Sequence, residues 1–406
     1  MDLEFKNPFR PGAGHMPPYL AGRQEETKEF KKLLAQDTIL ENLILTGRRG
    51  VGKTVLLDTF KPLAIEVGWL WVGTNLSESA SISEENIATR LLTDLSVVTS
   101  TIVIAHEDKQ AMGFAGEAKK VQHTLNFQTL EQLYKQTPGL VADKLKTVLE
   151  FVWRCLVRQK APGLIFAYDE AQNLSDHADK NQYPLALLLD VFQSIQKKDI
   201  PFMLVLTGLP TLFPKLVEAR TFAERMFRVV QIDRLTRKDS RDAIRKPIED
   251  AKCPIKLSSS SVETITSTSG GYPYFIQFIC REVYDVFIQK KTTGERARVP
   301  VEEITRKLDT DFFAGRWARA TDRQRDLLAV IATLKSCDTE FTVQEIVEAS
   351  KKDPDASFSS SHANQMLSSL CEAGLVFKNR HGRYSLGVPL LGEFIKRQIA
   401  RTSLPT

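Results

Sequence analysis

The sequence lacks the cysteine and histidine patterns of disulfide-rich and zinc-binding proteins. No C-x-x-C pair occurs, and the six histidines do not cluster with cysteines. The five cysteines are scattered along the 406 residues, at Cys155, Cys253, Cys280, Cys337 and Cys371. Neither a disulfide framework nor a zinc site is therefore expected. This thiol usage is typical of a reducing cytoplasm.

Long apolar runs and a large excess of one charge are also missing. No apolar stretch approaches the roughly 20 residues that a membrane helix needs, and the first six residues are acidic where a signal peptide would be basic. We therefore expect a cytoplasmic protein without a membrane partner. The net charge is only +5, with 26% charged residues. This composition excludes a polycation or a disordered tail, and permits nucleic-acid binding without requiring it.

The most informative segment is a glycine-rich loop between a short apolar run, residues 43–46, and a helical pattern over residues 54–63. It fits G-x-x-x-x-G-K-[ST], in which glycines let backbone N–H groups surround phosphates at the positive end of a helix. Lys53 is expected to reach the β and γ phosphates of ATP, and Thr54 to ligate Mg²⁺. The residues expected to contact the nucleotide here are Gly47, Gly50, Val51, Gly52, Lys53, Thr54 and Val55.

A second apolar run, residues 164–168, ends in two adjacent acids. At the carboxyl edge of a parallel sheet, Asp169 is expected to hold Mg²⁺ through water, and Glu170 to orient and deprotonate the attacking water. The alternative is an acidic pair that only caps the next helix. Thr207 ends another apolar run and is expected to sense the γ-phosphate, although such a threonine is also an ordinary turn residue.

Arginines precede the last apolar run, residues 229–232. Arg225 could reach the phosphate of a neighbouring subunit, so that the protein would self-assemble through the ATP site. Surface ion pairing explains Arg225 and Arg228 equally well at this point.

The order of the patterns predicts the domains. Apolar runs alternate with helical patterns over residues 1–235, which predicts an α/β domain with a parallel sheet, an N-terminal arm and an insertion near residues 98–130. Helical patterns dominate residues 236–313, which we expect to form a helical lid. Residues 314–406 read as three helices, 322–334, 342–349 and 362–373, followed by a hairpin with its tip at 379–382. That is the outline of a winged helix.

These features resemble the AAA+ superfamily of P-loop NTPases, in the branch of origin-recognition-type initiators and STAND signalling ATPases. The likeness covers nearly the whole chain and extends to bacterial ATP-binding proteins with an Asn-Pro-Phe-Arg-Pro-Gly start and a winged-helix end. It implies an ATPase with ATP or ADP and Mg²⁺ as cofactors. The residues that carry the resemblance are Tyr19 and Arg23 in an adenine-packing segment, Gly47 to Thr54 as Walker A, Asp169 and Glu170 as Walker B, Thr207 as sensor 1 and Arg225 as arginine finger.

One departure from the initiator pattern concerns the lid. Pro273 stands about where those ATPases carry a sensor 2 arginine, and the segment Gly271-Tyr272-Pro273 resembles the G-x-P motif of STAND proteins. In that family the segment packs against the nucleotide, which favours a switch with slow turnover. The alternative is a Gly-Pro turn that merely starts the helix at Tyr274.

Two functions follow from these patterns. In the first, a DNA-associated switch grips duplex DNA through Lys378, Arg380 and Arg383 of the wing. The predicted recognition helix would expose His362, Asn364, Gln365 and Ser368. In the second, a STAND-like signalling or defence regulator uses its nucleotide state to control a protein partner. A scaffold without ATPase activity is disfavoured, because the Walker A and Walker B residues are all present.

Overall fold

The computed structural model describes residues 7–12, 14–109, 119–293, 298–352, 357–380 and 382–402. Its contacts divide the chain into two compact units. The sheet unit comprises Gln24–Thr46 and Leu56–Gln231. The lid unit comprises the described residues within Met1–Arg23, Gly47–Val55 and Ile232–Thr406.

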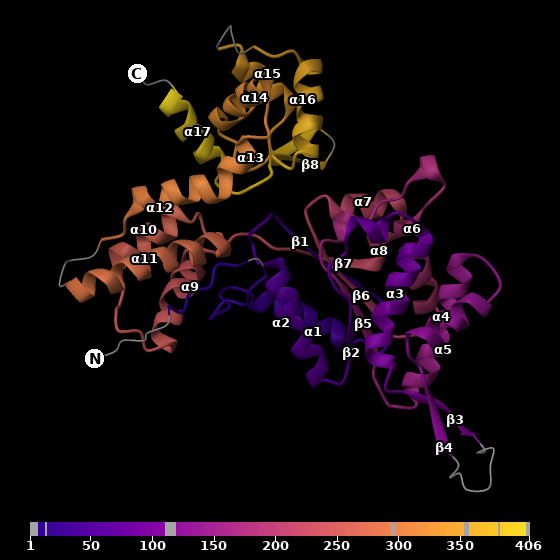
Figure 1. Ribbon diagram of the computed structural model, residues 1–406. Helices are drawn as coiled ribbons and strands as arrows, with labels where there is room; N and C mark the ends of the chain where they lie inside the picture. The colour runs from indigo at the N-terminus through magenta and orange to yellow at the C-terminus, as the bar shows by residue number, and fades with distance from the viewer. Residues whose placement is uncertain are drawn as a thin grey trace. The chain divides into compact units, whose positions relative to one another are not determined.

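The sheet unit is built on a five-stranded parallel sheet within the described residues, in the order β2-β5-β6-β1-β7 (Figure 1). Its strands are β1 (Asn42–Thr46), β2 (Leu70–Val72), β5 (Leu164–Tyr168), β6 (Phe202–Gly208) and β7 (Phe227–Gln231). The three central strands, β1, β5 and β6, are buried along their whole length. Continuous apolar runs suit such strands, because helices cover both faces of the sheet.

Helices cover the two faces of this sheet. Helices α1 and α2 lie together on one side, where the rings of Phe30 and Phe60 stack with their centroids 4.2 Å apart, while α3, α5 and α6 gather on the other side (Figure 1). The helices are α1 (Gln24–Leu34), α2 (Lys53–Glu66), α3 (Glu84–Thr99), α4 (Phe127–Gln136), α5 (Val141–Val157), α6 (Pro184–Gln196), α7 (Leu212–Ala219) and α8 (Ala223–Met226). Short 3₁₀ turns are η1 (Glu78–Ser81), η2 (Ala171–Asn173) and η3 (Ala178–Lys180).

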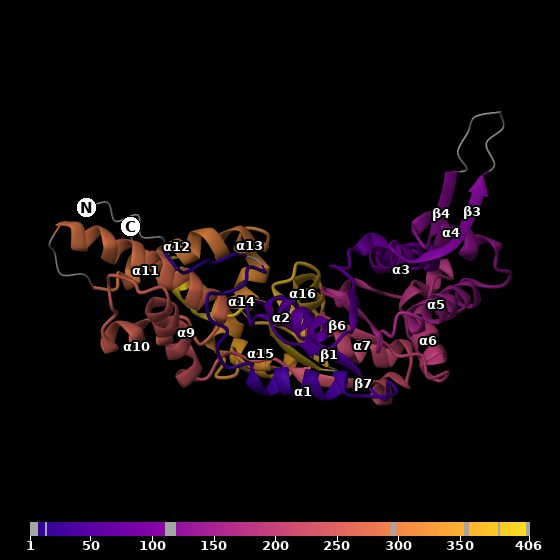
Figure 2. The same cartoon turned by 90° about the horizontal axis from the view of Figure 1, so that it is seen from below.

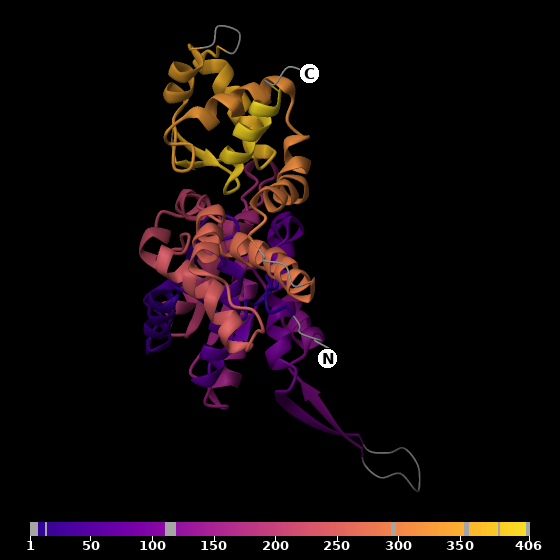
Figure 3. The ribbon, with the colours of Figure 1, turned by 90° about the vertical axis from the view of Figure 1, so that its left-hand side faces the viewer.

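The segment predicted as an insertion contains an antiparallel hairpin, β3 (Val103–Lys109) and β4 (Lys119–Thr124), which projects from the sheet unit (Figure 3). Residues 110–118 of that prediction lie outside the described residues. The hairpin is flanked by α3 and α4, whose apolar sides contribute Leu91, Leu95 and Leu130 to the core. The long interval between the two nucleotide motifs is therefore filled largely by α3, α4 and α5, which the sequence analysis did not identify.

The lid unit contains the predicted helices after residue 235. Helices α9 (Arg237–Asp250), α10 (Ser259–Thr268) and α11 (Pro273–Thr293) pack side by side (Figure 2). The hydroxyls of Thr236 and Ser258 cap α9 and α10, accepting from the third backbone N–H of each helix at 3.2 and 3.1 Å. Then follow α12 (Val301–Leu308), a π-helical turn η4 (Asp309–Ala314) and α13 (Gly315–Trp317).

Three helices and a hairpin follow, as predicted: α14 (Asp322–Thr333), α15 (Val343–Ser350), α16 (Ser360–Glu372), β8 (Val376–Arg380) and β9 (Arg383–Leu386). Between α14 and α15, Phe341 pairs its backbone with Tyr384 of β9 through hydrogen bonds of 2.8 and 2.9 Å. Helices α14 and α15 start at capping boxes at Thr321 and Thr342. These elements form the winged helix.

A last helix, α17 (Leu391–Thr402), was not predicted. It ties the winged helix to η4, since Arg397 pairs with the buried Asp309 at 2.5 Å and Phe394 stacks on Phe313 with ring centroids 5.2 Å apart. No helix within the described ranges is both long enough and apolar enough to cross a bilayer.

Candidate functional site

The phosphate loop, residues 47–52, follows β1 directly and leads into α2. Gly50 and Gly52 have φ of +78° and +92°, a backbone region that residues with side chains rarely adopt. Gly47 has no room for a side chain, because a Cβ there would lie 2.3 Å from the carbonyl oxygen of Ile232. The local geometry thus requires glycine at all three of these loop positions.

Lys53 is the first residue of α2 and is buried. Its Nζ donates hydrogen bonds to the carbonyl oxygens of Gly47 at 2.9 Å and Arg48 at 3.0 Å, so the ammonium lies over its own loop. The amino end of α2 also carries the positive end of the helix dipole. This loop can therefore hold an anion by backbone and side chain together.

The structure brings Asp169 and Thr207 together at the carboxyl edge of the sheet. They lie at the ends of the neighbouring strands β5 and β6, and both are buried. The Thr207 hydroxyl donates to Oδ1 of Asp169, and the backbone N–H of Glu170 donates to the same oxygen at 2.8 Å. Asp169 is thus an oriented carboxylate rather than a freely rotating one.

Glu170 is exposed and has a left-handed backbone, with φ of +52°. It occupies the position before η2, but its side chain makes no capping hydrogen bond there; its carboxylate accepts from the amide of Gln172 instead. Helix capping by Glu170 therefore does not explain this acid.

One acid near Asp169 was missed by the sequence analysis. Asp58 lies on α2, and its partial burial, followed by the negative charge of Asp169, raises its pKa above the usual value. Asp58 follows Thr54 by four residues, a spacing that places both on one face of a helix. That spacing is the signal that could have found it.

Arg23 braces the phosphate loop from the N-terminal arm. Its buried guanidinium donates from Nη2 to the carbonyl oxygens of Val51 at 2.9 Å and Asp233 at 2.8 Å. Tyr19, the other residue of the expected adenine segment, faces α9, where the ammonium of Lys246 stands 5.3 Å from its ring centroid. Both residues lie in the lid unit with the loop, and their contact with a nucleotide stays a prediction.

The glycine-proline segment before α11 also contacts the loop. The backbone N–H of Tyr274 donates to the carbonyl oxygen of Gly50 at 3.3 Å. Pro273 is the first residue of α11, a position where its missing N–H costs nothing. Gly271 accepts from the N–H of Leu235 at 2.8 Å, which joins the segment to the chain that enters the lid.

Two arginines of the loop, not singled out from the sequence, reach the winged helix. Arg48 donates to the carbonyl oxygens of Asp338 at 2.7 Å and Thr339 at 2.9 Å, between α14 and α15. The guanidinium of Arg49 lies 5.8 Å from the ring centroid of Phe377 on β8. The loop is therefore linked to two parts of the lid unit, α11 and the winged helix.

The two arginines near β7 have different surroundings. Arg228 pairs with Glu29 at 2.5 Å, so surface ion pairing accounts for it. Arg225 is exposed on α8 and has no ion pair within the described residues. It stays available for a contact with another molecule.

The expected DNA-binding face has exposed polar residues. The predicted positions on α16 are all exposed: His362, Asn364, Gln365 and Ser368. On the hairpin, Lys378 and Arg383 are exposed, and the side chain of Arg380 lies outside the described residues.

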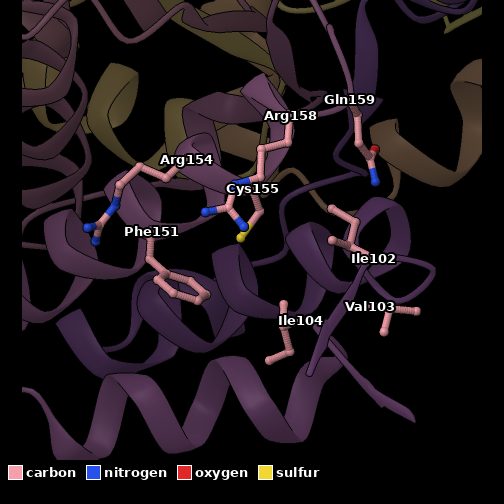
Figure 4. Close-up of a pocket in the computed structure, with 8 residues that line it drawn as sticks. All are labelled: Ile102, Val103, Ile104, Phe151, Arg154, Cys155, Arg158 and Gln159. Carbon is pink, nitrogen blue, oxygen red and sulfur yellow. The ribbon is translucent and has the colours of Figure 1, made fainter. Parts of the chain in front are cut away.

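A separate pocket of about 420 Å³ lies between the start of β3 and the end of α5 (Figure 4). It is lined by Ile102, Val103, Ile104, Phe151, Arg154, Cys155, Arg158 and Gln159. Residues 158–159 precede β5, whereas Asp169 follows it, so the pocket lies toward the opposite edge of the sheet. It does not belong to the nucleotide motifs.

Comparisons with known proteins agree with this architecture. A family model described as a domain of unknown function (DUF8462) matches residues 310–395, and no curated protein matches the sequence. The chain is similar to the structure of a Walker-type ATPase of Pyrococcus abyssi, with a TM-score of 0.57 and 15% identity over 97% of this chain and 99% of that chain. It is also similar to the Aeropyrum pernix ORC2 protein in its ADPNP–ADP complexes, with a TM-score of 0.52 and 13% identity over 97% and 98%. At such identities the comparison shows the fold: an α/β P-loop NTPase (AAA+) fold with a helical lid and a winged helix.

Proposed function

We propose that this protein is an ATPase that binds ATP, hydrolyses it slowly and uses the nucleotide as a conformational switch. The observation that carries the proposal is the set of contacts that the phosphate loop makes with the rest of the lid unit. Gly50 accepts from Tyr274 at the start of α11, and Arg48 donates to the loop before α15. A change in the phosphate loop on binding or losing a phosphate therefore acts directly on the lid and the winged helix.

The donor groups fit ATP and Mg²⁺. Glycines with positive φ allow a loop to turn its backbone N–H groups toward phosphate oxygens. The Lys53 ammonium, which donates to two carbonyl oxygens of the loop, can donate to phosphate oxygens instead when ATP is bound. The hydroxyl of Thr54 and the carboxylate of Asp169 are oxygen ligands of the kind Mg²⁺ prefers. When bound, Mg²⁺ neutralises charge on the phosphates.

In the hydrolytic step, this chain supplies a base and a positioning group. Glu170, exposed next to Asp169, orients the attacking water and accepts its proton at a carboxylate oxygen. Thr207 holds Asp169 in place through its hydroxyl and senses the γ-phosphate from the neighbouring strand. Arg225 stabilises the developing charge from a neighbouring subunit, in an assembly formed through the ATP site.

Binding of duplex DNA is the first activity that we propose this switch controls. Exposed Lys378 and Arg383 on the hairpin can contact phosphates while α16 enters a groove. Binding of a protein partner is the second candidate. Helix α16 carries no lysine or arginine to contact DNA phosphates. In addition, Phe377 of β8 contacts Arg49 of the phosphate loop, which connects the hairpin to the nucleotide site. A regulator in which nucleotide exchange frees the winged helix for that partner fits this contact.

The test is ATP hydrolysis with and without duplex DNA at low and moderate salt. Wild type is expected to hydrolyse ATP slowly, and Glu170→Gln to bind ATP with wild-type affinity while losing about 10²-fold or more in turnover. Lys53→Ala is the control that loses binding itself.

The outcomes separate the proposals. Stimulation by DNA that fades with salt supports the DNA-associated switch. Turnover indifferent to DNA, with ADP retained through purification, selects the protein-partner regulator. If the wild type binds no nucleotide, or Lys53→Ala binds as well as wild type, the ATPase proposal is wrong.

A further inference from the structure

The pocket at the base of the β3–β4 hairpin combines apolar and cationic side chains. Figure 4 shows the side chains of residues 102–104 on one side of it and those of α5 on the other. Ile102 is buried and Phe151 half-buried, whereas Val103 and Ile104 are 40% and 37% exposed. Small-ligand sites measure about 300–1,000 Å³ and have a mainly apolar lining with a few polar groups. The volume of about 420 Å³ and the lining of this pocket match that description.

The cations of the pocket come from the end of α5. Arg154 and Arg158 are exposed, and neither forms an ion pair with a carboxylate in the described parts of the chain. The guanidinium of Arg154 lies 5.7 Å from the ring centroid of Phe151, so this charge lies against an apolar side chain of the lining. The dipole of α5 favours cations at this end of the helix. It gives no reason for Val103 and Ile104 to remain exposed beside them.

The charges of both arginines act on the interior of the pocket. Cys155, between them in the sequence, also lines it and is half-buried. Burial raises the pKa of the Cys155 thiol, while the positive charges of Arg158 and Arg154 act to lower this pKa. The two arginines thus stabilise negative charge at the position of the thiol, and they would do the same for an anionic group of a ligand bound there.

We propose that this pocket binds a small amphiphilic anion, namely a carboxylate that carries an apolar chain. The chain covers Ile102, Ile104 and Phe151 and removes their apolar surface from water. The carboxylate pairs with Arg154 and Arg158. A neutral apolar ligand would leave the two cations unused, and an inorganic anion would leave the apolar lining in contact with water. Only a ligand with both parts complements the whole lining.

This site is separate from the proposed nucleotide site. Its lining includes no residue of the nucleotide motifs, and it lies toward the edge of the sheet opposite to Asp169. The ligand is therefore a second input to the protein, and Lys53→Ala is expected to bind it as the wild type does. Failure of the nucleotide proposal would leave that result unchanged.

The test uses decanoate, below its micellar concentration, as the probe. Acetate is the control for the carboxylate alone, and decyltrimethylammonium is the control for the same chain with a cationic head. Alkylation of each cysteine of the full chain by N-ethylmaleimide is followed by mass spectrometry. Cys155 reports on the pocket, and the partly exposed Cys253 and Cys371 of the lid unit are internal controls. Decanoate is expected to slow alkylation of Cys155 saturably and to leave the other two unchanged, while acetate and decyltrimethylammonium have no effect.

Titration calorimetry measures the contribution of each part of the pocket. Replacing Arg154 and Arg158 together by glutamine is expected to weaken decanoate binding roughly 3- to 30-fold, because two exposed ion pairs are lost. Octanoate is expected to bind wild type roughly 4- to 15-fold more weakly than decanoate, because two methylene groups are missing. The matched control is Arg306→Gln, which removes an exposed arginine of α12 in the lid unit and should leave decanoate binding unchanged. Thermal unfolding checks that each variant is folded, and the single glutamine variants serve if the double variant is not.

Absence of decanoate protection at Cys155 would overturn the inference, whether or not polyglutamate or phosphatidylglycerol vesicles protect it. Protection by those probes alone would assign the surface to an acidic peptide or to a membrane. Equal protection by decyltrimethylammonium would also overturn it, since the arginines would then not select an anion. Wild-type affinity for decanoate in a folded double variant would lead to the same conclusion.

Discussion

The contact of Arg48 with the winged helix gives the sharpest test of the switch. Replacing Arg48 by alanine removes two hydrogen bonds, to the carbonyl oxygens of Asp338 and Thr339, at 2.7 and 2.9 Å. Both acceptors lie between α14 and α15, in the winged helix, while Arg48 lies in the phosphate loop. The substitution therefore cuts a connection between these two parts without changing a motif glycine or Lys53.

The magnitude follows from the geometry. Each net hydrogen bond contributes about 0.5–1.5 kcal/mol, and the pair is partly exposed to solvent, so we take about 1–2 kcal/mol for both. That energy corresponds to an increase of roughly 5- to 30-fold in the population in which the winged helix has left the loop. Arg48→Lys keeps the charge but lacks the fork that reaches two carbonyls, so about half of the free energy is expected to be lost.

The assay is hydrogen–deuterium exchange of the segment 335–342, together with the release rate of a fluorescent ADP. When closing is faster than chemical exchange, exchange in Arg48→Ala is expected to rise roughly 5- to 30-fold over wild type, in proportion to the open population estimated above. ADP release is expected to accelerate in parallel. Unchanged exchange in a folded Arg48→Ala variant would refute the reasoning, since the contact would then contribute no stability. Faster exchange with unchanged ADP release would refute its link to the nucleotide.

Three further changes test the site and its support. Thr207→Val removes the hydroxyl that orients Asp169, so ATP turnover should fall roughly tenfold with ATP affinity little changed, as measured by steady-state kinetics and calorimetry. Asn42→Ala deletes a buried amide whose Oδ1 accepts from the N–H of Leu204 at 2.7 Å, and should cost about 2–4 kcal/mol in the free energy of unfolding by denaturant titration. Asp58→Asn should stabilise the protein slightly at pH 7, because the raised pKa of Asp58 means that its ionised form is disfavoured in the folded state. This gain should vanish below about pH 3.8, where the acid is protonated in the folded and unfolded states alike, and a gain that persists there in thermal unfolding would contradict the charge argument.

Local motifs predicted the positions of the elements around the site. The apolar runs that became β1, β5 and β6 are buried on both faces, and their carboxyl ends carry the loop, Asp169 and Thr207. Parallel strands all end at one edge of a sheet. Residues that follow neighbouring strands, such as β5 and β6, therefore lie close together at that edge. The hydrogen bond between Thr207 and Asp169 was not expected from the sequence, and their roles toward the γ-phosphate and Mg²⁺ stay predictions.

The helices between β2 and β5 were missed for a different reason. The pattern in α3, with Ile87, Leu91 and Leu95 buried at a spacing of four, was present in the sequence. The mixed polarity of the nearby hairpin, β3 and β4, led us to describe the whole stretch as an insertion. Only the packing shows that α3 and α4 complete the core and that the hairpin alone projects from it (Figure 1).

The sequence by itself determined the chemistry available at the loop and at the strand ends, because each motif is a short segment whose backbone is set by glycines and strand ends nearby. It also placed the lid and the winged helix, since their helices carry their own caps and apolar spacing. Only the tertiary structure decided which distant residues meet: Arg48 with residues 338 and 339, and Tyr274 with Gly50. Such pairs depend on how separate elements pack. The sequence around an arginine in a polar loop does not indicate which distant residue it will contact.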